Sequence, residues 1–98
     1  MTNQDKIKSM LELWIPGKLY KARVTSTFYT GHVSYETFKK NRTFRSEYKT
    51  VIKNSILLCI EAIPHNDRLY VFFLAPDSSI VWDGYYMSKH FNIYFKNV

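Results

Sequence analysis

The N-terminal apolar residues recur at the spacing of an α-helix. They stand at positions i, i+3, i+4 and i+7, as Ile7, Met10, Leu11 and Trp14. Four apolar side chains at this spacing lie on one face of a helix, which we expect within residues 1–15. Asn3 is the expected N-cap, and Pro16 with Gly17 ends the helix. The apolar face either closes one end of the domain or, in the alternative, binds a partner.

The next apolar residues alternate with polar ones, which is the period of a β-strand. In residues 18–29, Tyr20, Ala22 and Val24 alternate with cationic side chains. The run is rich in β-branched and aromatic residues, so we expect one half-buried strand here.

The C-terminal part of the chain has the pattern of several short strands. Its apolar runs span residues 56–63, 68–75 and 80–86. The turn sequences PHND and PDSS separate them, and strands joined by such short turns must be antiparallel. A last strand is expected at 92–97, with Ile93 and Phe95 on one face.

Residues 31–55 carry an ambiguous pattern. Phe44, Tyr48 and Val51 fit the spacing of a helix, but the same stretch also fits an irregular hairpin, and both interpretations stay open. Phe44 and Tyr48 are candidates for the core. The segment from Thr30 to Ser55 holds six cations and two anions, which is +4 of the net charge of +6. Such a local field favours acidic partners, unless it only keeps a small protein in solution.

The composition indicates one modest domain, residues 1–98, with the helix in 1–15 and a barrel in 18–98. Of the 98 residues, 46% are hydrophobic and 17% aromatic, which is enough for one core. The single cysteine, Cys59, lies within an apolar run, so we expect a buried, unreactive thiol. No stretch has the length and apolarity of a transmembrane helix, and the N-terminus is too polar for a signal peptide. The expected location is therefore cytoplasmic.

The histidines give little support to an enzyme. His32, His65 and His90 are far apart and do not have the spacing of metal ligands. A general-base pair of His90 with Asp83 is conceivable if the connector folds back on the preceding strand. The three glycines form no phosphate-binding motif. We expect no catalysis, no metal and no cofactor.

The order of the expected elements resembles that of an SH3-like barrel. One strand, a long excursion, three meander strands, a helical turn and a short final strand follow one another from Leu19 to Phe95. In this resemblance PDSS stands at the distal turn, IVWDGYY runs from the fourth strand into the 3₁₀ turn, and MSKH lies at that turn. The resemblance implies a mainly β fold, a five-stranded antiparallel SH3-like barrel with an N-terminal amphipathic helix and a long basic insertion at the position of the RT loop.

More narrowly, the chain is similar to the small SH3-like accessory proteins of large bacteriophages and some nucleocytoplasmic viruses. The similarity lies in PGKLY at residues 16–20 and in the ILLCIEAI strand, which comes before a strand that contains VW. It implies a viral or phage origin. Together with the charge and the absence of catalytic motifs, it favours a non-enzymatic protein-binding module. The implied partner is a host or viral protein with an acidic surface, bound in the host cytoplasm.

The resemblance also indicates partner-binding residues. Tyr29, Tyr85 and Tyr86 stand near the positions of the groove aromatics, and tyrosine gives a large contact area at low entropic cost. The cations expected to steer an acidic partner are Lys39, Lys40, Arg42 and Arg45. The proline that usually precedes the turn aromatic is absent and the insertion is basic, so a standard proline-rich ligand is not expected. Trp82 either packs in the core or forms the floor of the groove.

Nucleic-acid binding is the alternative function. Residues 38–53 interleave cations with aromatic side chains, and such a segment can place cations on phosphates and rings on bases. Glu47 interrupts the run, and no named nucleic-acid motif is present.

Overall fold

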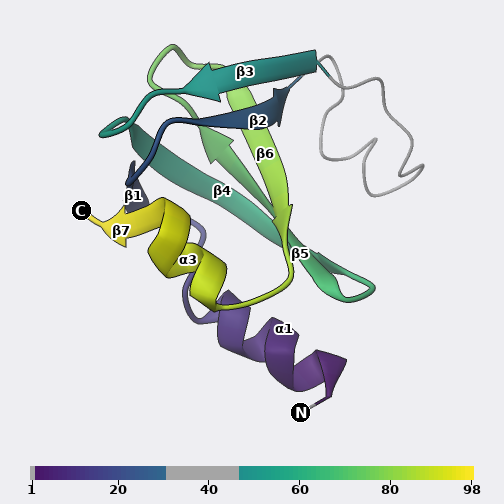
Figure 1. Ribbon diagram of the computed structural model, residues 1–98. Helices are drawn as coiled ribbons and strands as arrows, with labels where there is room; N and C mark the ends of the chain where they lie inside the picture. Colours follow the sequence, from purple (N-terminus) through teal and green to yellow (C-terminus); the bar gives the residue numbers. More distant parts are fainter. Residues whose placement is uncertain (1, 31–46) are drawn as a thin grey trace.

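The computed structural model describes residues 2–30 and 47–98 of the chain. Along these residues the elements are α1 (Asn3–Leu11), β1 (Leu19–Ala22), β2 (Ser26–Thr30), β3 (Glu47–Val51), β4 (Ile56–His65), β5 (Arg68–Leu74), β6 (Ile80–Tyr85), α3 (Lys89–Tyr94) and β7 (Phe95–Asn97). The strands form one sheet in the order β3-β2-β6-β5-β4-β1-β7, and every neighbouring pair is antiparallel. Figure 1 shows α1 and α3 together at one side of this sheet.

The sheet curls into a half-barrel because β1 and β2 are joined by only three residues. In the sheet order the two strands are four steps apart, which is about 19 Å in a flat sheet. The chain from Ala22 to Ser26 spans at most about 14 Å. Hydrogen bonds from Ala22 N to Ser55 O (2.9 Å) and from Asn54 N to Ala22 O (2.8 Å) hold the bend against the β3–β4 turn.

The mainly β, antiparallel fold and the N-terminal helix are confirmed. The β4–β5–β6 meander has the expected register of consecutive antiparallel pairs. The described residues form seven strands instead of five. The expected strand over 18–29 is broken at the bend into β1 and β2, where Val24 is exposed, and β3 adds a strand within the segment whose pattern was ambiguous. Thr2 caps the helix instead of Asn3, in a capping box with Asp5 that satisfies two backbone donors.

The expected C-terminal strand at 92–97 is wrong over its first half and confirmed over its second. Residues 89–94 form α3, and only Phe95–Asn97 pair with β1. Phe91 and Phe95 are both buried, whereas Ile93, expected beside Phe95, is 48% exposed. Residues four apart share a face in a helix and in a strand, but they are separated by about 6 Å along a helix and about 13 Å along a strand. The Phe91 and Phe95 rings lie 6.1 Å apart in one cluster, which the helical turn allows.

The ambiguous segment is a strand where it is described. Glu47–Val51 pairs antiparallel with β2, so the helical interpretation is wrong for these residues. Tyr48 is 66% exposed, so the prediction that it belongs to the core is also wrong. Phe44 lies outside the described residues.

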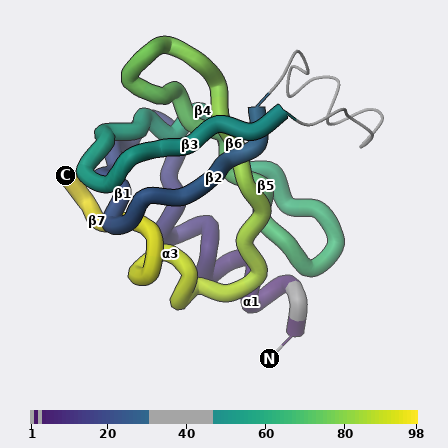
Figure 2. Tube along the Cα trace, turned by 45° about the horizontal axis from the view of Figure 1, so that its top comes forward, coloured from purple at the N-terminus to yellow at the C-terminus, as the bar shows by residue number. Residues whose placement is uncertain are grey.

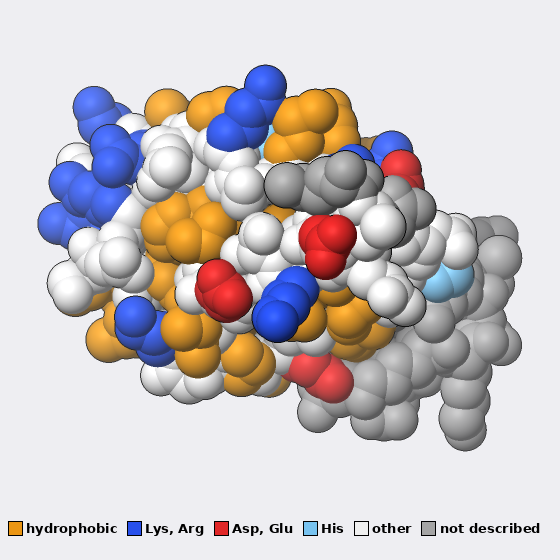
Figure 3. Space-filling model, turned by 90° about the horizontal axis from the view of Figure 1, so that it is seen from below, with side chains coloured by type: hydrophobic (Ala, Val, Ile, Leu, Met, Phe, Trp, Pro, Cys, Tyr) orange, Lys and Arg blue, Asp and Glu red, His pale blue; other side chains and the backbone are white. Residues whose placement is uncertain are grey.

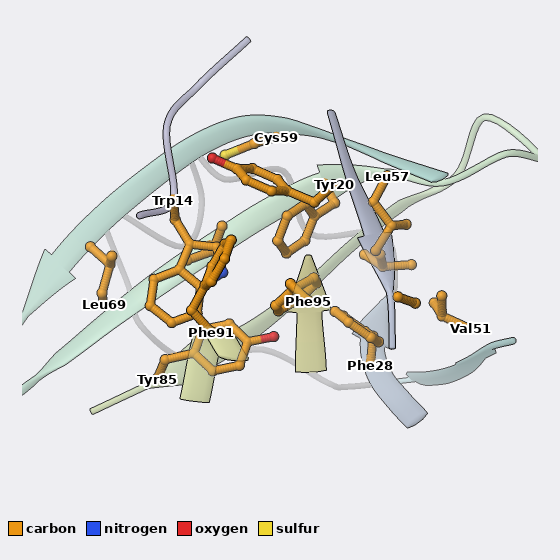
Figure 4. Close-up of a cluster of buried hydrophobic side chains, with 14 of the residues drawn as sticks. Trp14, Tyr20, Phe28, Val51, Leu57, Cys59, Leu69, Tyr85, Phe91 and Phe95 are labelled. Atoms are coloured by element: carbon orange, nitrogen blue, oxygen red, sulfur yellow. The ribbon is translucent and has the colours of Figure 1, made fainter. Parts of the chain in front are cut away.

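The main core fills the concave side of the sheet beneath the two helices. We call it the inner cluster; its aromatic members are Trp14, Tyr20, Phe28, Phe73, Tyr85, Phe91 and Phe95. Figure 4 shows Trp14, Tyr20 and Phe91 gathered around Phe95. The hydroxyl of Tyr20 donates to Leu13 O (2.6 Å) and accepts from Ile15 N (2.8 Å), which fixes the end of α1 to β1. Cys59 is buried as expected, and burial raises its pKa to about 11.

A smaller cluster lies on the opposite face of the sheet. This outer cluster consists of Ile63, Phe72 and Trp82, with Tyr29, Ile60 and Tyr70 packed against it. Phe72 belongs to it, whereas its neighbours Val71 and Phe73 belong to the inner cluster, as strand alternation requires. Trp82, 6% exposed, therefore packs in a hydrophobic cluster.

Candidate functional site

A pocket lies where β2 and β6 separate. Their register contains one residue pair, Tyr29↔Trp82, and Figure 2 shows the two strands diverging from this crossing towards α3. The pocket has a volume of about 240 Å³ and is lined by Ser26, Thr27, Asp83, Gly84, Tyr85, Tyr86, His90 and Tyr94. We call it the β2–β6 pocket. It combines both strands with α3, so it exists only when the sheet is curled.

Asp83 supplies the negative charge of the β2–β6 pocket. Its Oδ1 accepts the Gly84 N–H at 2.8 Å, and no ion pair to it occurs within residues 2–30 and 47–98. Burial raises the pKa of the carboxyl group, although the Gly84 N–H and the more distant charge of Arg68 act in the opposite direction. Asp83 is thus a partly dehydrated carboxyl group held in place by the backbone.

Aromatic side chains line the same pocket as this carboxyl group and form its aromatic wall. The Tyr86 ring is 42% exposed at the rim and stands edge-on to His90, with ring centroids 4.7 Å apart. The Tyr85 and Tyr94 rings lie 6.4 and 6.3 Å from the His90 ring. Burial, assisted by the charge of Lys89, lowers the pKa of His90, so the imidazole is neutral at pH 7.

The structure corrects the expected role of Tyr85. Its side chain is 4% exposed and stacks on Trp14, with centroids 4.6 Å apart; Figure 4 shows it beside Trp14 and Phe91 in the inner cluster. Burial raises the pKa of its hydroxyl well above 10, so the group stays neutral. Of the two adjacent tyrosines, Tyr86 is the one whose ring a partner can reach.

Tyr29 does not join this site. Its ring stacks on Trp82 at 4.7 Å and lies 5.2 Å from Tyr48, on the outer face of the sheet. The tyrosines expected to act together are therefore divided between the two faces. The expected steering residues Lys39, Lys40, Arg42 and Arg45 lie outside the described residues.

His90 and Asp83, considered above as a general-base pair, line the same pocket. No hydrogen bond joins the two side chains in the described part of the chain, and His90 Nδ1 is buried with no hydrogen-bond partner there. Among the same residues, no group of three or more His, Cys, Asp or Glu side chains is placed to hold a metal ion. None of the helices described has the length and apolarity to cross a membrane.

Besides Gly84, which follows Asp83 in the chain, sequence reasoning missed three lining residues, namely Ser26, Thr27 and Tyr94. The first two were assigned to a continuous strand, and Tyr94 to a strand that is in fact α3. No local pattern in the sequence indicates that these residues meet Asp83. Their proximity follows from the bend between β1 and β2.

A second polar feature is a basic edge of the sheet, formed by Lys21, Arg23 and Lys96. Lys21 and Lys96 are directly opposite each other in the β1–β7 register, and the side chain of Arg23 donates from Nε to Phe95 O at 2.8 Å. Within the described chain these cations have no ion pair. In Figure 3, Lys and Arg side chains gather on the side of the molecule where the C-terminus lies in Figure 1. Like charges placed opposite each other destabilise a sheet, and lysine at an edge strand also discourages edge-to-edge pairing.

Comparison with protein-family models, curated proteins and solved structures gives no match for this chain.

Proposed function

We propose that the protein is a non-enzymatic protein-binding module that docks its partner at the β2–β6 pocket, with Tyr86 as the anchor at the rim. The observation that carries the proposal is the half-exposed Tyr86 ring beside a hollow that also contains a desolvated carboxyl group. Concave sites with aromatic walls and a few convergent polar groups are typical binding sites. Tyrosine is also among the residues that contribute most to binding at interfaces.

The SH3-like resemblance supports the same location. In that resemblance the segment after the third meander strand provides the turn aromatic of a peptide groove, and Tyr86 directly follows β6, the last strand of the meander. The finer assignment of the half-barrel as an SH3-like barrel, and of the protein as a viral or phage accessory factor in the host cytoplasm, is part of this proposal and rests on the resemblance.

The partner in this proposal is a host or viral protein whose surface is acidic overall. A net charge of +6 attracts such a surface over a distance of several ångströms and raises the association rate. Lys39, Lys40, Arg42 and Arg45 are the proposed steering residues. The contacts that retain the partner are then made at the pocket.

The test has two steps. The wild-type protein captures its partner from a lysate, and the purified partner is then titrated calorimetrically against wild type, Tyr86→Ala and Tyr48→Ala. Tyr48 is a matched control because it is an exposed tyrosine on the opposite face. We expect Tyr86→Ala to weaken binding about 30-fold or more, as a hot spot does, and Tyr48→Ala to leave it unchanged. Equal affinity of wild type and Tyr86→Ala would disprove docking at the pocket.

The basic edge favours nucleic-acid binding as a second candidate function. Lys21 and Lys96 are paired without a neutralising acid, and phosphates between them would relieve their repulsion. A gel shift with single- and double-stranded DNA and RNA at two salt concentrations tests this candidate. Binding that weakens with salt and is reduced in Lys21→Gln plus Lys96→Gln supports it. Absence of a shift, or a shift unaffected by the two substitutions, rejects the basic edge as the binding surface.

A further inference from the structure

We infer that the β2–β6 pocket receives the ammonium group of a lysine side chain from the partner, with Asp83 as counter-ion and the tyrosine rings as walls. The inference rests on the proposed docking function and names the chemical group that enters the site. An acidic partner can still present one lysine to the pocket. The net positive charge of the chain acts on the approach of the whole partner, whereas the lysine makes one local contact.

The first argument is the charge balance of the pocket. Its lining contains a carboxyl group without an ion pair in the described chain, and a histidine that is neutral at pH 7. An anionic ligand would therefore meet Asp83 without compensation from the lining. A cation would restore the electrostatic stabilisation that the carboxylate loses when water is removed.

The second argument is the aromatic wall. The faces of tyrosine rings attract cations, and an ammonium group surrounded by aromatic rings is a recurrent recognition mode. The protein already uses one of these rings in this way, because the guanidinium carbon of Arg68 lies 5.6 Å from the centroid of Tyr86. Arg68 itself does not line the pocket.

The hydrogen bonding favours an ammonium over a guanidinium group. A guanidinium binds a carboxylate best through two parallel hydrogen bonds, one to each oxygen. Asp83 Oδ1 already accepts the Gly84 N–H, so Oδ2 is the better acceptor for an incoming donor. A single ammonium donor needs only that oxygen.

The size of the pocket agrees with a lysine side chain. A volume of about 240 Å³ corresponds to roughly eight water molecules at ~30 Å³ each. The amine and the methylene groups of lysine fit this space, with the methylenes against the exposed ring of Tyr86.

The experiment is a titration of the isotope-labelled full chain, followed by amide chemical shifts. The probes are N-acetyl-lysine amide, N-acetyl-arginine amide and N-acetyl-norleucine amide, whose uncharged side chain keeps the four carbons of lysine without the amine. We expect the lysine probe to shift Gly84, Tyr86 and His90 and to bind at least about tenfold more tightly than the norleucine probe. Asp83→Asn should abolish this preference. Asp67→Asn is the matched control, since it removes the same charge from the exposed β4–β5 turn.

Arg68→Gln should change the affinity for the lysine probe in the opposite direction to Asp83→Asn. The positive charge of Arg68 partly offsets the negative charge of Asp83. Without it the pocket is more negative, so the lysine probe should bind Arg68→Gln more tightly than it binds the wild-type protein. A purely structural effect of Arg68 on Tyr86 would instead weaken binding of every probe.

The inference is overturned if the norleucine probe binds as well as the lysine probe, if the arginine probe binds better, or if Asp83→Asn keeps the preference. Failure of the inference and of the proposed function can be told apart. If the lysine probe does not bind but Tyr86→Ala still abolishes partner binding, the inference is wrong and the docking function remains. If the lysine probe binds but a saturating amount does not compete with the partner, the pocket is an amine site and the docking function is wrong.

Discussion

Strand β6 is paired very differently along its two edges. With β5 it forms a continuous register from Leu69↔Tyr85 to Leu74↔Ile80, whereas with β2 it shares only Tyr29↔Trp82. The β5 edge is backed on both faces by hydrophobic clusters. The β2 edge opens into the pocket. The same strand therefore provides a rigid wall on one side and the polar groups of the candidate site on the other.

The difference shows how a small half-barrel can make a site without a long loop. We call the edge of β6 that pairs with β5 the closed edge and the edge towards β2 the open edge. The closed edge positions β6, and the alternation of side chains along β6 then determines which of them face the pocket. Asp83 and Tyr85 face the same side as the inner cluster, but at Asp83 the sheet is no longer continued by β2. A polar residue is tolerated there because the gap admits solvent or a ligand.

The largest expected effect is on the closed side of β6. Phe73 is 0% exposed and its ring contacts Phe28, Tyr20 and Phe95. Phe73→Ala should therefore lower the free energy of unfolding by about 3–5 kcal/mol. Denaturant unfolding measures the change. A loss below about 1 kcal/mol would mean that the closed edge is not the more tightly packed one.

A substitution at Gly84 tests the packing of β6 beside the pocket, where β6 still pairs with β5 but no longer with β2. A Cβ atom at this position would lie 2.9 Å from Cε1 of Tyr70, on the side of the outer cluster. Gly84→Ala should therefore destabilise the protein by about 1–3 kcal/mol, the usual range for overpacking. The double variant with Tyr70→Leu should recover most of this loss, and an unchanged loss would place the strain elsewhere.

A substitution of Asp83 should have the opposite effect on stability to Phe73→Ala. Its pKa is raised in the folded state, so the folded protein holds this proton more tightly than the unfolded chain. The resulting stability is present below the usual aspartate pKa of about 3.9 and is lost as the pH rises through the folded-state value. Asp83→Asn should therefore raise the thermal midpoint at pH 7.

The difference between Asp83→Asn and wild type should vanish at about pH 3, where both side chains are uncharged. Thermal scans at the two pH values measure it, with Asp67→Asn as the exposed control. A gain in stability together with loss of the lysine preference would show that the open edge is kept for binding at the expense of stability. A lower midpoint at pH 7 would contradict a desolvated carboxylate.

The smallest expected effect on folding is that of Tyr86→Leu. The ring is 42% exposed at the rim, and surface substitutions usually change stability by no more than about 0.5 kcal/mol. The variant should therefore unfold like wild type while it loses partner binding. A large destabilisation would mean that Tyr86 supports the wall of the pocket instead of contacting the partner.

The individual strands were predictable where burial is regular. Long apolar runs bounded by turn residues indicated β4, β5 and β6, and the helical stripe ending at Trp14 indicated α1. The same reasoning failed for residues 89–94, because a short segment with aromatic residues has no clear period of its own. The positions of Phe91 and Phe95 in the core decide between helix and strand there.

The candidate site was predictable only in part. Tyr86 was identified from its place after the meander, and Asp83 and His90 were considered only as a catalytic pair. Tyr86 is exposed and Tyr85 is buried although the two residues are adjacent, since β6 ends between them. Local sequence does not distinguish two tyrosines at such a boundary.

The sequence by itself determined the antiparallel meander, the amphipathic helix and the buried cysteine, because each depends on periodicity and on residues close in the chain. The tertiary structure alone decided that Ser26 and Thr27 lie opposite Asp83 and His90. That arrangement depends on how far the sheet curls. The curl is set by the three residues between β1 and β2 together with the hydrogen bonds to the β3–β4 turn, which are contacts between segments distant in sequence.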